Sequence, residues 1–294
     1  MKSWSAVIAK IEQATGQCFA LQKVEPMHGG DINRVYRLQS STQSYFVKLN
    51  KADLLMMFEV EALGLHDLAS THTLRIPEPI CSGTAGENAF LVLEYVVLHS
   101  LSKRSQQQLG EQLARLHQIQ QDYFGWHHDN YIGSNLQKNS RKNDWVHFWQ
   151  EQRLAVQFEL AKKNGYTGKL QALGAELYEL VPQFFSSYQP SASLLHGDLW
   201  SGNASADEQG QAIIYDPACY YGDREADIAM TELFGGYSHD FYAAYDAVWP
   251  LDSGYKARKS LYNLYHILNH LNLFGSGYLH QAEVMMQILI AEAK

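Results

Sequence analysis

The chain has 294 residues, of which 46% are hydrophobic and 18% charged, and its 23 basic and 31 acidic residues give a formal net charge of -8. A chain of this length and composition can bury a large core, which excludes a small disulfide-stabilised scaffold and a disordered protein. The acidic balance and the lack of a basic run argue against nucleic acid as a partner.

The cysteines and the first residues bear on the compartment. Cys18, Cys81 and Cys219 are scattered and form no CxxC pair, so they predict neither a disulfide framework nor a thiolate zinc site. The first residues carry Lys10 and Glu12 among their apolar positions, and no run of about 18 apolar residues occurs in the sequence. We expect a cytoplasmic protein without a membrane partner.

A helix and three strands are predicted at the start of the chain. Ser3 is a suitable N-cap and Gly16 a suitable C-cap for an amphipathic helix between them. Residues 19–25, 34–39 and 44–50 then alternate apolar and polar side chains, with turn-forming residues between the three segments. This pattern predicts an antiparallel meander.

A second helix and a further strand follow the meander. Residues 53–70 have helical periodicity. Pro77 and Pro79 then keep the next segment extended, and the apolar run AFLVLEYV at 89–96 predicts a strand. We therefore expect a strand-rich first lobe that ends at Val96.

The rest of the chain is predicted to be mainly helical. Helices are expected at 102–120, 143–163, 168–186, 224–234, 238–248 and 255–275, and near the C-terminus. A strand-and-loop region at 193–217 interrupts them, and the aromatic loop at 121–142 is long enough that we expect it to line a site. The predicted fold class is α+β, with a small antiparallel-sheet lobe at 1–96 and a mainly helical lobe at 97–294.

The densest polar cluster lies in the strand-and-loop region. Asp198 and Asn203 are five positions apart, and Asp216 directly follows the apolar run AIIY. Carboxylate and amide oxygens suit Mg²⁺, which completes its coordination with water and substrate phosphate. The spacing is that of the protein-kinase catalytic loop, with Asp216 in the place of the metal-binding aspartate.

A kinase-type site also needs a lysine in a strand and a glutamate on the helix that follows. Lys48 lies in the middle of a predicted strand, and Glu59 and Glu61 are the two candidates on the helix. Glu61 falls on the apolar stripe between Phe58 and Leu65, and a charge on a buried face needs a partner. We therefore predict that Glu61 pairs with Lys48 and that Glu59 points elsewhere.

Two further segments are expected to contact a nucleotide. Gly29 and Gly30, between the first two strands, would let the backbone approach the phosphates closely. Backbone groups of Glu94 and Val96, in the strand that ends the first lobe, would meet the adenine edge. The expected cofactors are ATP and Mg²⁺.

Longer motifs around these residues carry a family resemblance. They are MFEVEALGL (57–65), LLHGDLWSGN (194–203), IIYDPACYYGDREADIA (213–229), LFGGY (233–237) and LYHILNHLNLFG (264–275). Through these motifs nearly the whole chain resembles the fructosamine kinase, or ketosamine kinase, family. That family is part of the protein-kinase-like group that includes the aminoglycoside and choline phosphotransferases.

The resemblance implies ATP-dependent phosphorylation of the hydroxyl on the third carbon of a ketosamine, such as a fructosamine or ribulosamine adduct. Phosphate beside a carbonyl is a good leaving group, so its elimination and the release of the amine would make the reaction a deglycation step. Another small-molecule kinase, for an aminoglycoside or choline, and a non-catalytic nucleotide-binding module stay open as alternatives. The acceptor is a free ketosamine or a glycated protein lysine, and a monomer is expected.

Five residues have expected roles in this reaction. Asp198 orients the sugar hydroxyl and accepts its proton, and Asn203 and Asp216 hold Mg²⁺ against the phosphates. Lys48 anchors the phosphates, and Glu61 positions Lys48.

The residues around this set have structural and functional interpretations. Trp200 either stacks on the sugar or fills the loop, and Asp223 is a candidate substrate contact. His196 is expected to support the loop, and Asp227 to cap a helix or bind the loop backbone. The segment from Asp216 to Asp227 is too short for an activation loop, which predicts constitutive activity.

Other polar or reactive positions are expected to be structural. The adjacent residues His127, His128 and Asp129 do not converge on one ion, so a substrate-pocket loop is favoured there over a metal site. Cys219 is expected to be a small core residue. The stripe of Tyr262, Tyr265, His266, Asn269 and His270 has the helical spacing of a packed core with a polar edge.

Overall fold

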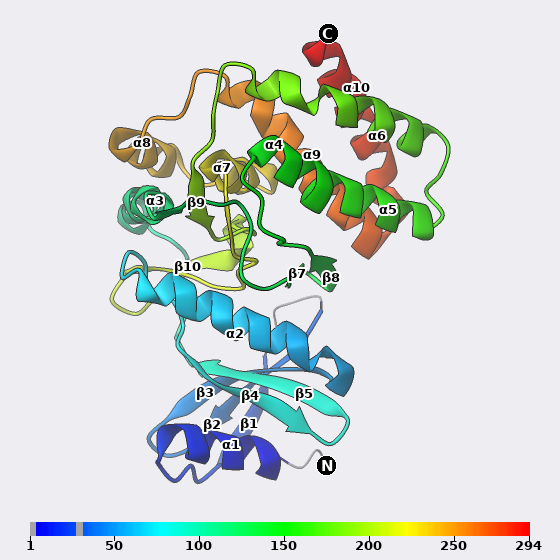
Figure 1. The fold of residues 1–294 in the computed structure, drawn as a ribbon. Helices are drawn as coiled ribbons and strands as arrows, with labels where there is room; N and C mark the ends of the chain where they lie inside the picture. The colour runs from blue at the N-terminus through cyan, green and yellow to red at the C-terminus, as the bar shows by residue number, and fades with distance from the viewer. Residues whose placement is uncertain (1–3, 28–31) are drawn as a thin grey trace. The chain divides into compact units, whose positions relative to one another are not determined.

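The computed structural model describes residues 4–27 and 32–294, and it divides into two compact units. The first unit comprises Met1–Ser105 with Ser205–Pro217, and the second comprises Gln106–Ala204 with Ala218–Lys294. The first is built on an antiparallel sheet and the second is mainly helical (Figure 1), so the fold is α+β. The predicted boundary at residue 96 separates a nucleotide-binding lobe from a catalytic lobe, and this functional division stays a prediction.

The first unit contains a five-stranded antiparallel sheet. Its strands are β1 (Lys23–Pro26), β2 (Arg34–Gln39), β3 (Ser44–Lys51), β4 (Pro79–Ala85) and β5 (Asn88–Glu94). They lie in the order β1-β2-β3-β5-β4, so the first three strands form the predicted meander and β5 pairs with β3. The strand predicted at 19–25 begins four residues before β1 and ends one residue before β1 ends, and β4 was not predicted as a strand.

A helix packs on each face of this sheet. Helix α1 (Ser5–Thr15) buries Val7 and Ile11 against Val47 and Leu49 of β3, and Gly16 ends it with a φ of 67°. Because successive strand residues face opposite sides, Lys48 points to the other face, where α2 (Leu55–Ser70) lies (Figure 1). The predicted N-cap Ser3 is outside the described residues; Trp4 occupies the N-cap position of α1.

Short elements complete the first unit. A 3₁₀ turn, η1 (Ala52–Leu54), links β3 to α2. Strands β10 (Ala204–Ala206) and β11 (Ala212–Ile214) form a two-stranded sheet, and an isolated parallel bridge joins Arg75 to Ile213. This bridge fixes the end of β11, two residues before Asp216, against the first unit.

The second unit is built around a long buried helix, α9 (Tyr255–Phe274). The helices that precede it are α3 (Lys103–His117), α4 (Trp145–Phe148), α5 (Ala155–Lys163), α6 (Lys169–Leu180), α7 (Arg224–Leu233) and α8 (His239–Val248), and α10 (Leu279–Ala293) follows. Helices α5, α7 and α10 pack against α9. The predicted helix at 143–163 is interrupted by a π-helical segment, η2 (Trp149–Leu154), and α6 ends in a 3₁₀ segment, η3 (Val181–Phe185). A short 3₁₀ turn, η5 (Ser276–Tyr278), separates α9 from α10.

Two small sheets lie among these helices. Strands β12 (Tyr220–Gly222), β9 (Ala192–Leu195) and β6 (Gln120–Gln121) form one, in that order. Strands β7 (Asn130–Ile132) and β8 (Asn135–Gln137) form a separate hairpin. The segment predicted as a loop at 121–142 therefore contains an ordered hairpin.

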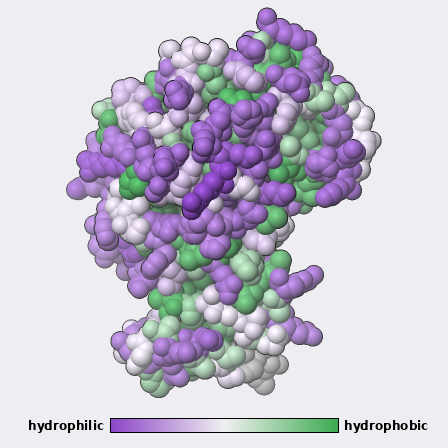
Figure 2. Space-filling model, in the orientation of Figure 1, coloured by the Kyte–Doolittle hydropathy of each residue, from purple (hydrophilic) through white to green (hydrophobic). Residues whose placement is uncertain are grey.

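The face of the molecule seen in Figure 2 has a mixed hydropathy. Figure 2 shows hydrophilic residues over much of one face, with hydrophobic residues between them. Large apolar side chains that are at least 45% exposed include Met56, Leu98, Leu136, Phe274 and Ile288, which come from separate segments of the chain. Among the described residues, no helix is both long and apolar enough to span a membrane.

Candidate active site

A buried lysine forms the centre of the site in the first unit. Lys48 on β3 is 5% exposed, and its Nζ lies 2.6 Å from Oε1 of Glu61 on α2. The same Nζ also forms an ion pair with Oδ1 of Asp216, which follows β11. The pairing predicted between Lys48 and Glu61 is therefore present, and Glu59 does not take part in it.

The two carboxylates keep the lysine charged. Burial alone lowers the pKa of Lys48, but Asp216 and Glu61 beside the ammonium outweigh burial and raise that pKa above its ordinary value. Burial raises the pKa of Glu61, and Lys48 opposes this rise. The Lys48 side chain is therefore a buried ammonium cation held between two carboxylates.

Asp216 has an unusual backbone conformation for a residue other than glycine. Its φ is 58°, in the left-handed region, and Pro217 follows it. Its side chain is 44% exposed even though Oδ1 accepts from Lys48. Strained backbone of this kind is often found where a functional group must be aimed, and the exposed carboxylate leaves room for a further ligand.

In the second unit, Asp198 and Asn203 lie on the loop that follows β9. Nδ2 of Asn203 donates to the main-chain oxygen of Asp198 at 2.8 Å and is 3.4 Å from its Oδ2. These bonds fix which side of the Asn203 amide carries the NH₂ group, so the amide oxygen points away from Asp198. The five-residue spacing seen in the sequence thus closes a compact loop.

Asp227 on α7 anchors the backbone that leads into this loop. Its carboxylate accepts from the N–H groups of His196 at 2.7 Å and Gly197 at 2.8 Å, and it lies 3.2 Å from Nε2 of His117. Burial raises the pKa of Asp227, but these hydrogen bonds and His117 outweigh burial and lower it. Of the two structural roles expected for Asp227, the structure shows backbone binding.

His196 is a support residue, as expected. It is fully buried, and its Nδ1 accepts from the N–H of Asp198 at 3.2 Å. The next residue, Gly197, has a φ of 83°, and a Cβ there would lie 2.1 Å from the oxygen of Ala218. Both residues therefore shape the loop that carries Asp198.

Trp200 is half-buried at the surface of the same loop. It is 39% exposed, and its ring covers Gly202, where a Cβ would lie 2.2 Å from the ring. Its main-chain oxygen accepts from the hydroxyl of Tyr237 at 3.1 Å. The ring fills the loop and also presents a free face, so a substrate contact by Trp200 stays a prediction.

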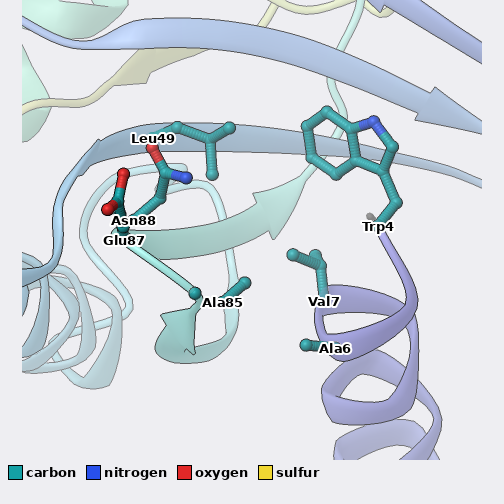
Figure 3. Close-up of a pocket in the computed structure, with 8 residues that line it drawn as sticks. Trp4, Ala6, Val7, Leu49, Ala85, Glu87 and Asn88 are labelled. Atoms are coloured by element: carbon teal, nitrogen blue, oxygen red, sulfur yellow. The ribbon is translucent and has the colours of Figure 1, made fainter. Parts of the chain in front are cut away.

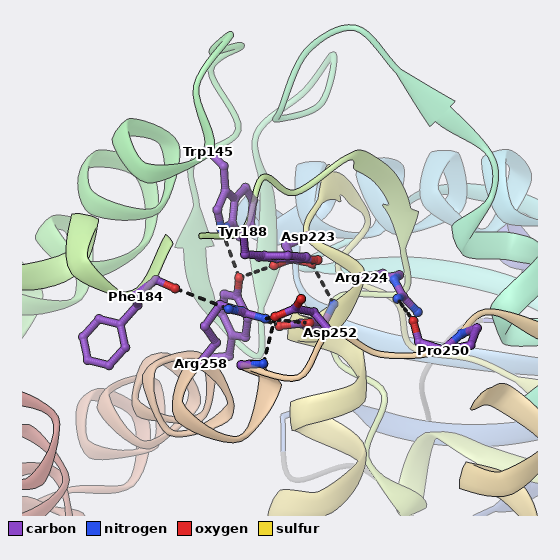
Figure 4. Close-up of polar contacts among 11 residues, drawn as sticks. Trp145, Phe184, Tyr188, Asp223, Arg224, Pro250, Asp252 and Arg258 are labelled. Atoms are coloured by element: carbon purple, nitrogen blue, oxygen red, sulfur yellow. Dashed lines mark hydrogen bonds and ion pairs between the residues drawn. The ribbon is translucent and has the colours of Figure 1, made fainter. Parts of the chain in front are cut away.

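The structure corrects the expectation for Asp223. Its side chain is fully buried and caps α7 by accepting from the N–H of Glu225 at 3.0 Å (Figure 4). The hydroxyl of Tyr188 donates to it at 3.0 Å, and the hydroxyl of Tyr262 donates to its other oxygen. Because no part of Asp223 is exposed, it is a structural residue and not a substrate contact.

Two arginines form a hydrogen-bond network around the Asp223 cap. The sequence analysis did not predict this network. Arg258 on α9 donates to both carboxylate oxygens of Glu225, at 2.7 and 3.1 Å, and to Asp252 at 2.6 Å. Arg224 donates to the main-chain oxygens of Trp249, at 2.7 Å, and Pro250 (Figure 4). These bonds tie α7, α9 and the segment before α9 together behind the loop that Asp227 anchors.

The predicted nucleotide contacts fall on two segments of the first unit. Gly29 and Gly30 are outside the described residues. Glu94 ends β5, where its N–H donates to the oxygen of Glu78 at 2.8 Å and its carboxylate pairs with Arg75. An adenine contact at Glu94 would therefore use its main-chain oxygen; this contact and that of Val96 stay predictions.

The residues expected at a magnesium site have suitable chemistry. Asp216 offers a partly exposed carboxylate, and the Asn203 amide oxygen is turned away from its hydrogen-bonded neighbour. These two residues are one carboxylate and one amide. A different kind of metal site, a cluster of three or more His, Cys, Asp or Glu side chains, is not found among the described residues. At the His127–Asp129 segment, the Asp129 carboxylate instead accepts from the N–H of Asn139 at 2.8 Å.

A hollow in the first unit lies away from these groups. It has a volume of about 310 Å³ and is lined by Trp4, Val7, Leu49 and the turn between β4 and β5 (Figure 3). Because Leu49 and Lys48 face opposite sides of β3, the hollow lies on the α1 face and Lys48 on the α2 face.

The late helix and Cys219 are core features. Cys219 is buried, as are the α9 residues Tyr262, Tyr265, His266 and Asn269. His270, at the polar edge of the stripe, packs against aromatic rings. This agrees with the core interpretation of the stripe.

Comparison with known sequences assigns the family. The model of the fructosamine kinase family matches residues 3–292. A probable ketoamine kinase of Synechocystis sp. is 44% identical, covering 97% of this chain and 96% of the relative. A chloroplastic protein-ribulosamine 3-kinase of Arabidopsis thaliana is 39% identical, covering 90% of this chain and 81% of the relative.

Solved structures agree with this assignment. A candidate fructosamine-3-kinase from Haemophilus somnus has a TM-score of 0.91 at 28% identity, covering 98% of each chain. An aminoglycoside phosphotransferase has a TM-score of 0.67 at 12% identity, covering 99% of this chain and 100% of the other, which shows the shared protein-kinase-like fold. The chain is an ATP-dependent kinase that belongs to the fructosamine kinase family.

Proposed function

We propose that this kinase transfers the γ-phosphoryl group of ATP to the hydroxyl on the third carbon of a ketosamine. The observation that carries the proposal is the buried ion-pair group of Lys48 with Glu61 and Asp216, which supplies a fixed cation for phosphates. The names of the relatives, a ketoamine kinase and a protein-ribulosamine 3-kinase, support the acceptor class and the carbon.

The roles of the site residues follow from their chemistry. Lys48 binds phosphate oxygens, and Glu61 holds the lysine in place. Asp198 accepts a hydrogen bond from the sugar hydroxyl, orients it for attack and takes its proton as the new phosphoester bond forms. Asn203 and Asp216 are the residues that would bind Mg²⁺. When bound, that ion neutralises negative charge on the phosphates.

The product explains how phosphorylation reverses glycation. The carbonyl at the second carbon acidifies the proton on the first carbon, and loss of that proton expels phosphate from the third. Water then replaces the amine on the dehydrated sugar. The free amine and inorganic phosphate are released, so no second active site is needed.

The direct test is Mg²⁺-dependent ADP release with ribulose-lysine and fructose-lysine as acceptors. Choline, an aminoglycoside and a reaction without acceptor serve as comparisons. We expect ketosamine-stimulated turnover, and phosphorus NMR should find the new phosphoester on the third carbon, followed by inorganic phosphate. Turnover with choline or the aminoglycoside alone would overturn the acceptor class, and ATP binding without turnover on any acceptor would favour a non-catalytic module.

A variant pair tests the role of Asp198. We expect Asp198→Asn to lower kcat about 10²–10⁴-fold, because a positioned general base contributes about that much. The exposed Asp122→Asn variant is the matched control and should keep wild-type turnover. If Asp198→Asn retains more than about a tenth of the wild-type kcat, Asp198 is not the base.

A further inference from the structure

We propose that the β7–β8 hairpin fixes the chain just after Asp216, with Asn130 and Gln137 as positioning residues of the kinase reaction. This inference rests on the proposed role of Asp216. The two short strands belong to the second unit and are labelled in Figure 1. The family motifs do not include this segment, and neither residue was identified from the sequence.

The hairpin presents a row of amide side chains on one face. Asn130 and Gln137 are direct partners in the hairpin register, and side chains of directly opposed residues lie on the same face. Asn135, two residues before Gln137 in β8, shares that face by strand alternation. Asn139 follows the end of β8, and its side chain also contacts Asn130. Leu136 is on the opposite face and is 45% exposed.

Two of these amides bind the backbone that follows Asp216. Nε2 of Gln137 donates to the main-chain oxygen of Ala218 at 3.0 Å, and Nδ2 of Asn130 donates to that of Cys219 at 2.8 Å. Gln137 is 1% exposed and Asn130 4% exposed, so water does not compete for these bonds. The hairpin therefore holds consecutive carbonyl groups through buried hydrogen bonds.

The loop that carries Asp198 holds Ala218 from another side. The N–H of Ala218 donates to the main-chain oxygen of His196 at 2.8 Å, and its carbonyl lies against Gly197, which has no room for a Cβ. Ala218 is thus bound at its N–H by the loop and at its carbonyl by Gln137. The backbone next to the proposed base and the backbone next to Asp216 meet at this residue.

A second row of contacts orients the two amides. The hydroxyl of Tyr265 donates to Oε1 of Gln137 at 2.7 Å, which leaves the Gln137 NH₂ group for Ala218 and for Oδ1 of Asn130, at 2.8 Å. Asn139 also donates to that Asn130 oxygen, at 2.9 Å. Each amide therefore has one arrangement that satisfies its donors and acceptors.

The positioning role follows from the strain at Asp216. A non-glycine residue in the left-handed region persists only when its surroundings determine its conformation. Within the first unit, the parallel bridge at Ile213 fixes the chain three residues before Asp216, and within the second unit the hairpin binds the chain from Ala218 onward. A segment held in this way stays ordered without phosphorylation, which fits the short stretch between Asp216 and Asp227.

The test compares two amides of the same hairpin. Gln137→Met keeps the length of the side chain but removes its donors, and Asn135→Ala is the matched control. Asn135 donates to Asn269 on α9 at 2.8 Å, so its loss removes an amide hydrogen bond without touching Ala218. Both full-length variants are compared with the wild type by hydrogen exchange and by kinetics.

Hydrogen exchange is read in peptides that cover residues 214–222, without nucleotide or acceptor. We expect faster exchange there in Gln137→Met and wild-type exchange in Asn135→Ala. Because no substrate is needed, this readout stands even if the proposed acceptor is wrong. Unchanged exchange in Gln137→Met, or an equal increase in both variants, would overturn the positioning role.

Kinetics show whether the fixed segment matters for the reaction. We expect kcat of Gln137→Met to fall tenfold or more, since a displacement of about 1 Å at a reacting centre costs about 10²-fold. The Mg²⁺ concentration for half-maximal rate should rise, while KM for the acceptor stays within about twofold. Wild-type kcat in Gln137→Met would overturn the inference.

A second variant keeps the test decisive if Gln137→Met does not fold. Gln137→Glu retains the acceptor for Tyr265 but places a carboxylate against the oxygen of Ala218. A protonated carboxyl regains one donor, so we expect the kcat of this variant, relative to wild type at each pH, to increase as the pH falls. A relative kcat that does not change with pH would contradict a role through this hydrogen bond.

Discussion

At the scale of single residues, the ion pairs of Lys48 connect the stability of the fold with the proposed role of this lysine in phosphate binding. Its ammonium group is buried between Glu61 and Asp216, so removing it leaves a buried carboxylate without a partner. We expect Lys48→Met to abolish detectable turnover and to lower the free energy of unfolding by about 2–4 kcal/mol, because an uncompensated buried charge is costly. Urea denaturation measures the second effect.

A double variant separates the charge effect from lost packing. Adding Glu61→Gln to Lys48→Met removes the unpaired carboxylate, so the double variant should be more stable than Lys48→Met alone and equally inactive. Lys51→Met, at an exposed position on the same strand, is the control and should change stability by about 0.5 kcal/mol or less. A double variant that is less stable than Lys48→Met would show that the unpaired Glu61 carboxylate is not what destabilises Lys48→Met.

Single residues differ in how far sequence predicts them. Glu61 could be distinguished from Glu59 because local periodicity alone places it on the buried face of α2, and the structure contains its pair with Lys48. The burial of Asp223 could not be predicted, because its partners Tyr188 and Tyr262 come from distant segments. No local pattern reports a contact between residues so far apart.

At the scale of elements, α7 supports the loop that carries Asp198. The carboxylate of Asp227 accepts two main-chain N–H groups of that loop, and an asparagine has only one oxygen to offer them. We expect Asp227→Asn to lower the free energy of unfolding by about 2 kcal/mol or more, since a buried donor loses its acceptor. Loosening the backbone before Asp198 should also lower kcat.

Calorimetry and steady-state kinetics test this anchor together. Asp246→Asn is the control, because Asp246 accepts one main-chain N–H at an exposed position, at 3.1 Å. The control should change stability by less than about 1 kcal/mol and leave kcat unchanged. An Asp227→Asn variant as stable and active as this control would show that the loop does not depend on α7.

Elements were predictable where their buried face is apolar. Strand β2 has the predicted bounds, and β3 and the long helices lie within a few residues of theirs. Strand β4 was missed because its first residue, Pro79, was interpreted as part of an extended segment. β4 is an edge strand, and an edge strand tolerates proline at its first residue. The β7–β8 hairpin was missed because its buried face consists of amides, which hydrophobic periodicity does not detect.

At the scale of the whole molecule, the order of elements along the chain was enough to predict an α+β fold with a sheet lobe before a helical lobe, whereas its kinase-like type was predicted from the motifs around Asp198 and Asp216. Strand periodicity is confined to the first third, apart from short strands, and helices follow. The two compact units do not follow the chain order completely, because the first unit also contains Ser205–Pro217 from the later part of the chain. The place of this segment in the first unit could not be predicted, because it depends on a bridge between Arg75 and Ile213, which lie far apart in the sequence.

The stability of the whole molecule should depend on pH through buried histidines. Burial lowers the pKa of His266 to about 3 from 6.5, and burial also lowers that of His117. In the unfolded chain these histidines take up protons near pH 6.5, whereas in the folded protein they take them up only at lower pH. Their contribution to stability is therefore complete above that pH and is lost as the pH falls toward the folded-state pKa.

His266→Gln isolates one of these contributions. Between pH 7.5 and 5.5, His266 should cost the wild type about 1.4 kcal/mol of unfolding free energy, which the variant should not lose. Urea denaturation at the two pH values measures the difference, and His280→Gln, at an exposed position, should keep the wild-type dependence. The same acid-induced loss in His266→Gln and the wild type would mean that this imidazole becomes protonated in the folded protein, and the decline would then have to come from other groups such as His117.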